Sequence, residues 1–146
     1  MKKICSTVFY LTIVAGLLLC FCGSGFAEDL IVILNKEIPD TSITKDDIKK
    51  IYLGDRITWS DSSTIIVTTL EKGPEHERFL KDYVGRSLSQ FKMTWKKLMF
   101  TGKGKSPKEF GSPAELIDFV SQNKGAIGYV TAGSGNTDNV NVIPLN

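Results

Sequence analysis

Residues 72–78 hold the residue types best suited to binding a ligand. Gly73 and Pro74 predict the start of a helix there, because proline is favoured in the first turn, where its missing N–H is not needed. The free N–H groups of that turn and the positive end of the helix dipole favour an anion. Lys72, His76 and Arg78 add positive charge and hydrogen-bond donors. We therefore take Lys72, Gly73, His76 and Arg78 as the candidate ligand-binding residues.

An ordinary helix start is the alternative interpretation of the same segment. Glu75 and Glu77 fall in the first turn, where carboxylates already satisfy the helix dipole and repel an anion. Arg78 is expected to pair with Glu75 or Asp82 within the helix. His76 is the only histidine, and we expect it to be solvated on the first turn.

The residue types and their spacing give little indication of catalysis or of cofactor binding. A lone histidine does not build a metal site, and no nucleophile elbow or paired-acid pattern is present. Residues 101–106 superficially look like a phosphate-binding P-loop, but Met99 stands where that motif needs glycine, and the segment follows a helix. We expect residues 101–111 to form a mobile basic loop that contacts a partner. The chain is predicted to be no enzyme and to carry no metal or cofactor.

Residues 1–27 have the parts of an export signal. Lys2 and Lys3 precede an apolar run over residues 4–22, and small residues lead to Ala27. We expect cleavage after Ala27, with residues 28–146 exported to the periplasm or secreted and not inserted in the membrane. An uncleaved anchor is an alternative, since about 20 apolar residues can span a bilayer. Lipid attachment at Cys20 or Cys22 is another, although neither follows the usual small residue.

The composition is that of a globular protein. The 146 residues are 42% hydrophobic and 23% charged, with a formal net charge of +2. These values argue against disorder and against a strongly basic nucleic-acid binder. All three cysteines and two of the lysines fall in the predicted signal. The 119 residues that follow are close to neutral and free of cysteine, so packing alone must hold their fold.

Apolar patterns predict strands that alternate with helices. Strands are expected over residues 30–34, 65–70, 126–130 and 140–145. Helices are expected over residues 44–53, 74–84, 87–99 and 112–125, with Ser87 or Ser89 capping the third. This alternation indicates a single α/β domain, with helices covering a short, mostly parallel sheet.

Ligands of such sheets lie beyond the carboxyl ends of the strands. The candidate loops at those ends are residues 35–38, 71–77 and 131–138. Trp59 and Trp95 are expected to be largely buried, because large aromatic side chains dominate protein cores. Trp59, in a polar loop, is the one expected to be more exposed.

Several short strings, taken together and in order, are similar to a known family. They are IYLG at residues 51–54, Trp59 with Asp61, RF at 78–79, VGRS at 84–87, Gln90 with Trp95, FTGKG at 100–104, Pro107 and GAIGYV at 125–130. In this order and spacing they resemble the short periplasmic proteins related to the phosphate-binding subunit of ABC importers. Those proteins belong to the type 2 periplasmic-binding superfamily.

The resemblance covers essentially all of residues 28–146. It implies a periplasmic-binding-protein-like α/β lobe, export, and a non-enzymatic role in solute binding. The implied ligand is a small, phosphate-like oxyanion, and the implied partner is an ABC permease or a membrane sensor.

The sequence departs from the family's pattern in two ways. Full phosphate-binding proteins have two lobes and are longer. Their binding signature, an arginine followed by a Ser-Gly-Thr run at a helix start, is replaced here by TLEKGPEH at residues 69–76. The family's phosphate ligands therefore do not transfer residue by residue. A second hypothesis follows, in which the chain is a ligand-free periplasmic adaptor or sensor partner.

Overall fold

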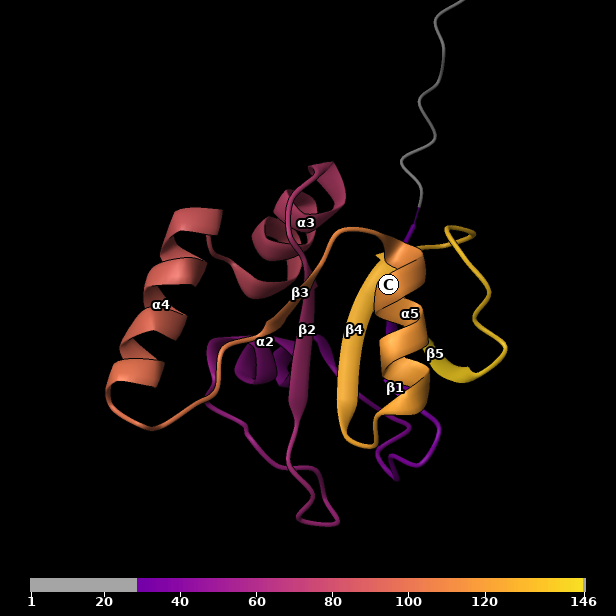
Figure 1. Cartoon of the computed structure of the whole chain (residues 1–146), viewed down its shortest axis with the longest axis horizontal. Coiled ribbons are helices and arrows are strands. Elements are labelled where there is room, and N and C mark those ends of the chain that lie inside the picture. The colour runs from indigo at the N-terminus through magenta and orange to yellow at the C-terminus, as the bar shows by residue number, and fades with distance from the viewer. Residues whose placement is uncertain (1–28, 146) are drawn as a thin grey trace, which may run out of the picture.

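The computed structural model describes residues 29–145, so the predicted export signal lies outside the described residues. The strands are β1 (Leu30–Asn35), β2 (Ile66–Leu70), β3 (Lys108–Phe110), β4 (Ala126–Thr131) and β5 (Val140–Pro144). The helices are α2 (Lys45–Leu53), α3 (Pro74–Phe79), the π-helical segment η1 (Leu80–Val84), α4 (Leu88–Phe100) and α5 (Pro113–Gln122). Figure 1 shows their arrangement.

The five strands form one mixed sheet in the order β3-β2-β4-β1-β5. β2 is parallel to β3 and β4, whereas β1 is antiparallel to both β4 and β5. Four strands therefore share one direction, and only β1 opposes them. The predicted α/β class with a short, mostly parallel sheet is confirmed.

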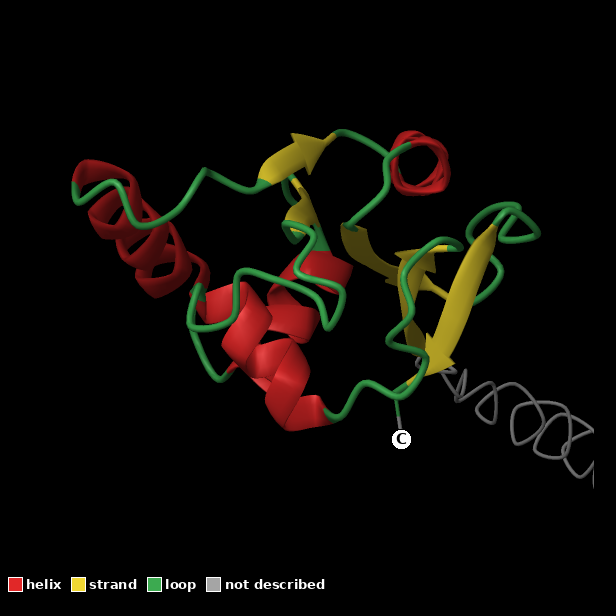
Figure 2. Cartoon of the chain, turned by 90° about the horizontal axis from the view of Figure 1, so that it is seen from below, coloured by secondary structure: helices red, strands yellow, loops and turns green. Residues whose placement is uncertain are grey.

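Helices cover both faces of the sheet. α5 lies on one face, and α2, α3 and η1 group on the opposite side with α4 beyond them (Figure 2). The alternation of side chains along β4 shows why. A side chain at Gly128 would meet Leu116 of α5, so this position must be small. The next residue, Tyr129, points the other way, and its ring stacks on Phe79 with centroids 3.7 Å apart.

Local sequence signals set the helix ends. Thr44 and Ser87 each cap a helix through a capping box, and Ser112 accepts a hydrogen bond from the N–H of Glu115. Of the two serines proposed for α4, Ser87 is the cap. The helix predicted over residues 74–84 is present, but its second half is π-helical rather than α-helical.

Two predictions about local structure were wrong. β3 lies within the segment predicted as a basic loop, where it pairs with β2. Trp59 and Trp95 are both buried, as expected, but Trp59 is 3% exposed and Trp95 5%, so Trp59 is not the more exposed of the two. The polar residues around Trp59 suggested exposure. The indole N–H of Trp59 is instead buried and donates to the carbonyl of Gly125, 66 residues away in sequence, at 2.9 Å.

Candidate functional site

The carboxyl edge of the sheet brings two of the three predicted loops together. β2, β3 and β4 run parallel, so Leu70, Phe110 and Thr131 end at the same edge. α3 follows β2 there, and α5 follows β3 (Figure 1). The third predicted loop, residues 35–38, lies at the opposite edge, because β1 runs antiparallel to β4. That part of the prediction was wrong.

Gly73 forms the start of α3 in a conformation that favours glycine. Its φ angle is 121°, and an added Cβ would lie 2.9 Å from the Oε2 atom of Glu75. No side chain caps α3, whereas α2, α4 and α5 each have a capping side chain. The first intrahelical bond runs from the N–H of Glu77 to the carbonyl of Gly73, at 3.2 Å. The first turn of α3 therefore lacks the side-chain acceptor that the other three α-helices have.

His76 is buried, so the expectation of a solvated histidine was wrong. Its side chain is 2% exposed, and Nδ1 is hydrogen-bonded to the hydroxyl of Tyr129. The two rings are nearly parallel, with an interplanar angle of 7°. The backbone N–H of Leu70 donates to the same hydroxyl at 3.3 Å. His76 thus ties the first turn of α3 to the ends of β2 and β4.

Burial also sets the charge of this pair. Desolvation, assisted by the nearby positive charge of Lys92, lowers the pKa of His76 from 6.5 to about 4. Burial raises the pKa of the Tyr129 hydroxyl well above its ordinary value. Both groups are therefore neutral at pH 7, and His76 brings no positive charge to a ligand.

Lys72 and Arg78 differ in their surroundings. Lys72 is exposed in the turn between β2 and α3. Arg78 is half-buried, and its Nε atom lies 4.0 Å from a carboxylate oxygen of Asp82 at i+4. The predicted pairing of Arg78 within the helix is confirmed, with Asp82 as the partner. Lys72 is the candidate cation closest in sequence to the uncapped start of α3.

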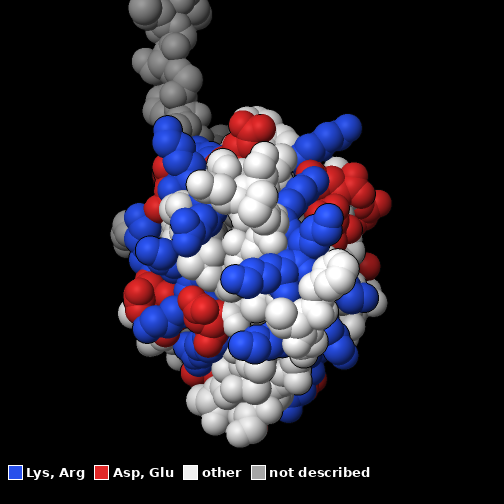
Figure 3. Space-filling model, turned by 90° about the vertical axis from the view of Figure 1, so that its left-hand side faces the viewer, with Lys and Arg blue, Asp and Glu red and all other residues white. Residues whose placement is uncertain are grey.

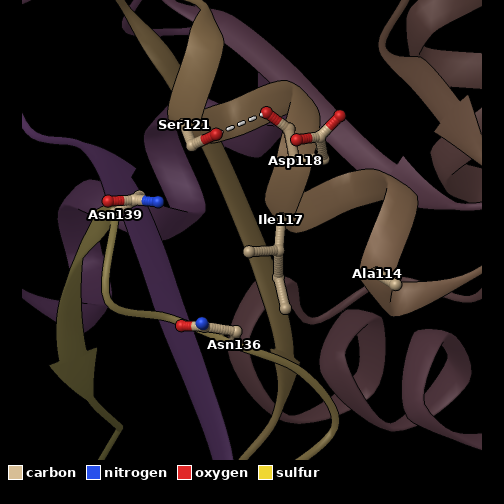
Figure 4. A pocket seen from close by; sticks show the side chains of 6 residues that line it. All are labelled: Ala114, Ile117, Asp118, Ser121, Asn136 and Asn139. Atoms are coloured by element: carbon tan, nitrogen blue, oxygen red, sulfur yellow. Dashed lines mark hydrogen bonds between the residues drawn. The ribbon is translucent and has the colours of Figure 1, made fainter.

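The hollow in Figure 4 lies between α5 and the segment that leads into β5. It has a volume of about 250 Å³ and is lined by Ala114, Ile117, Asp118, Ser121, Asn136 and Asn139. Ser121 donates to the carbonyl of Asp118 at 2.7 Å, as the dashed line marks. Its lining includes a carboxylate and no cationic side chain, so this hollow does not suit an anion.

A larger groove, of about 560 Å³, lies at the other end of β2. Ile57, Ile65, Ile66 and Trp95 are among its apolar lining residues, and Lys103, Lys105 and Lys108 are among its basic ones. A third and more open hollow, of about 700 Å³, is lined by Glu77, Lys81 and residues 85–89. None of these three hollows is lined by Lys72, Gly73, His76 or Arg78.

Two kinds of feature are absent from residues 29–145. These residues contain no group of three or more His, Cys, Asp or Glu side chains that could hold a metal ion. Over the same residues, no helix has the length and apolarity needed to cross a membrane.

Comparison with solved structures identifies the fold. The chain superposes on an ABC-type phosphate transport receptor from Vibrio cholerae with a TM-score of 0.62 and 21% identity, and on PstS from Borrelia burgdorferi with 0.57 and 20%. A Clostridium perfringens protein whose structure holds bound phosphate gives 0.60 and 22%. The chain has the fold of a periplasmic-binding-protein lobe. The resemblance predicted from the ordered strings is confirmed.

The superpositions extend over most of this chain but over only part of each solved structure. The three superpositions cover 80%, 82% and 80% of this chain, but only 45%, 47% and 44% of those proteins. The superposed part of the chain therefore spans less than half the length of each solved structure. No family model and no curated protein matches the sequence.

Sequence reasoning missed Tyr129 as part of the candidate site. It stands in the predicted strand 126–130, and the pattern of that strand gives no sign that the hydroxyl contacts His76, 53 residues earlier. The contact arises because β2 and β4 are neighbours and α3 folds back across their ends.

Proposed function

We propose that the chain is an exported, non-enzymatic solute-binding-like protein that takes a small oxyanion at the start of α3. The observation that carries this proposal is the fold, which it shares with phosphate-binding proteins of ABC importers. In this proposal, residues 1–27 direct export to the periplasm, and an importer permease or a membrane sensor receives the liganded lobe.

The uncapped start of α3 supports this choice of site. The N–H groups of Glu75 and His76 belong to a first turn that no side chain caps, at the carboxyl edge where α/β sheets bind ligands. The helix continues without a break from residue 74 to residue 84, first as α3 and then as η1. Lys72 adds a positive charge one residue before Gly73.

Glu75 is the main obstacle to an anion at this position. Its carboxylate lies close to Gly73, so it occupies the space that an oxyanion needs and repels it electrostatically. Replacing this carboxylate with an amide removes the charge and keeps the shape. The variant Glu75→Gln is therefore expected to bind an oxyanion more tightly than the wild type.

Calorimetric titration of residues 28–146 with inorganic phosphate and with sulfate tests the proposal. We expect heat of binding from phosphate or sulfate, a gain of about fivefold in affinity for Glu75→Gln, and a loss of similar size for Lys72→Ala. Glu115→Gln is the matched control, because Glu115 lies in the first turn of the capped helix α5 and should leave the affinity unchanged. Absence of heat with both anions, for the wild type and Glu75→Gln alike, would contradict the proposal.

A further inference from the structure

The outer face of α4 combines exposed apolar side chains with lysines. We define this face by Lys92, Met93, Lys96, Lys97 and Phe100. Met93 is 72% exposed and Phe100 is 87% exposed, and the three lysines are exposed as well. The inner side of α4 packs against the lobe, because Phe91 and Trp95 are buried in the core. The apolar side chains of the outer face therefore contribute little to the packing of the lobe.

The segment that contains α4 carries charge of a single sign. Residues 83–108 contain seven lysines and arginines and no aspartate or glutamate. The ion pairs found among the described residues use Lys50, Arg56, Arg78 and Lys124, none of which belongs to α4. Figure 3 shows the side of the molecule on which α4 lies, where many basic side chains lie among uncharged ones and acidic side chains gather at the top, the upper right and the lower left. The face thus carries concentrated positive charge on a chain that is almost neutral.

Helical spacing mixes the two kinds of side chain. Lys92, Lys96 and Phe100 follow one another at i, i+4 and i+8, and Met93 and Lys97 form a neighbouring row. Lysine side chains therefore lie on both sides of Met93 and Phe100. None of the hollows described above is lined by these residues, so the face is the outer surface of a helix rather than a groove.

We propose that the outer face of α4 binds the surface of an anionic phospholipid bilayer. The lysine ammonium groups contact lipid phosphates, and Met93 and Phe100 enter the headgroup layer between them. The opposite charge of the bilayer selects this occupant, and a broad layer accommodates the outward-facing surface of a helix. The lobe would in this way be held beside the membrane without any spanning segment. This inference rests on α4 and does not depend on oxyanion binding at α3.

Sedimentation with lipid vesicles tests the inference. Residues 28–146, which contain the whole described core, are mixed with vesicles of phosphatidylcholine alone or with 30% phosphatidylglycerol. The double variant Lys96→Ala/Lys97→Ala should lose about 25-fold in partitioning to the anionic vesicles, since each lysine near such a surface contributes about fivefold. Phe100→Ser should lose about fivefold, because an apolar side chain no longer leaves water.

The control is Lys36→Ala/Lys49→Ala, which removes the same charge from exposed positions outside α4. It should partition within about threefold of the wild type, a far smaller effect than the 25-fold expected for α4. Circular dichroism melting shows that each variant is folded. The inference is overturned if the wild type does not prefer anionic vesicles, or if the control variant loses as much binding as the α4 variant.

Binding unchanged by Phe100→Ser would overturn the insertion of that side chain. Capture of an acidic protein together with indifference to the vesicles would assign the face to a protein partner instead.

Discussion

His76 and Tyr129 hold the start of α3 against the sheet through a hydrogen bond made in the core. The histidine ring also meets Phe91 edge-on, with centroids 6.2 Å apart, so α4 packs against the same group. A buried neutral imidazole must be desolvated, and protonation would place a charge where the surroundings are aromatic. In the proposed site we therefore expect the side chain of His76 to position the first turn of α3, and its backbone N–H to face the ligand.

The lowered pKa of His76 predicts a pH dependence of stability. The pKa is about 4 in the folded chain and about 6.5 in the unfolded chain, so the unfolded state takes up the proton first as pH falls. The contribution of His76 is fully present above pH ~6.5 and is lost as pH falls toward 4. Between pH 7 and pH 4.5 the wild type should lose about 2 kcal/mol of unfolding free energy more than His76→Gln, which does not titrate. Urea unfolding at the two pH values measures this difference, and equal losses in the two proteins would show that His76 is not the titrating group.

Residues with local partners were the ones that sequence predicted correctly. Arg78 pairs with Asp82 at i+4, a spacing fixed by the helix itself. The partners of His76 and Trp59 lie 53 and 66 residues away. His76 was wrongly expected to be solvated, and Trp59, although correctly expected to be buried, was wrongly expected to be the more exposed tryptophan. Their burial depends on which strands become neighbours, which their own segments do not reveal.

At the scale of elements, capping decides where the helices begin. Ser87 accepts a hydrogen bond from the N–H of Gln90 at 3.3 Å, and the side chain of Gln90 accepts one from the N–H of Ser87 at 3.0 Å. The helix that this cap starts carries Phe91 and Trp95 into the core and presents the outer face of α4 to solvent.

The cap of α4 gives a prediction with an internal control. Ser87→Ala should reduce the unfolding free energy by about 1 kcal/mol, because the first turn loses its acceptor. Ser89→Ala removes a hydroxyl two residues away that is not the cap, and it should change stability by less than about 0.5 kcal/mol. Denaturant unfolding at pH 7 measures both. A larger effect at Ser89 than at Ser87 would mean that the helix begins elsewhere.

Short and irregular elements escaped prediction because their own residues carry weak signals. β3 has three residues, Lys108 and Glu109 are exposed, and only its pairing with β2 makes it a strand. The π-helical turn in η1 leaves the apolar pattern of residues 79–84 intact, so that pattern predicted an ordinary α-helix. The helices α2, α4 and α5 were predicted well, because apolar periodicity and capping residues agreed in each.

For the whole molecule, the direction of β1 had the largest consequence for the site. Its apolar run predicted a strand buried on both faces, as in a parallel sheet. The burial is confirmed, but the parallel direction was wrong, because β1 is antiparallel to both of its neighbours. The loop after it was therefore assigned to the wrong edge. The carboxyl edge of this lobe is formed by β2, β3 and β4, with the beginnings of α3 and α5 beside it.

The two proposed binding surfaces lie on different helices of the lobe. The candidate oxyanion site lies at the start of α3, and the basic outer face lies on α4. The sequence had led us to expect a partner contact at the basic loop after α4, not on the helix itself. If both proposals hold, an anion bound at α3 is presented by a lobe that rests on the bilayer through α4. The two sites use different residues, so each is testable without the other.

Mapping of backbone amide chemical shifts by NMR tests the oxyanion site most directly. Inorganic phosphate is added to ¹⁵N-labelled residues 28–146 at constant pH and ionic strength, with chloride as the control salt. The account predicts saturable shifts centred on the amides of Glu75, His76 and Glu77, with much smaller ones along α4. Shifts confined to the lysines of α4, or no saturable shift at the start of α3, would contradict it.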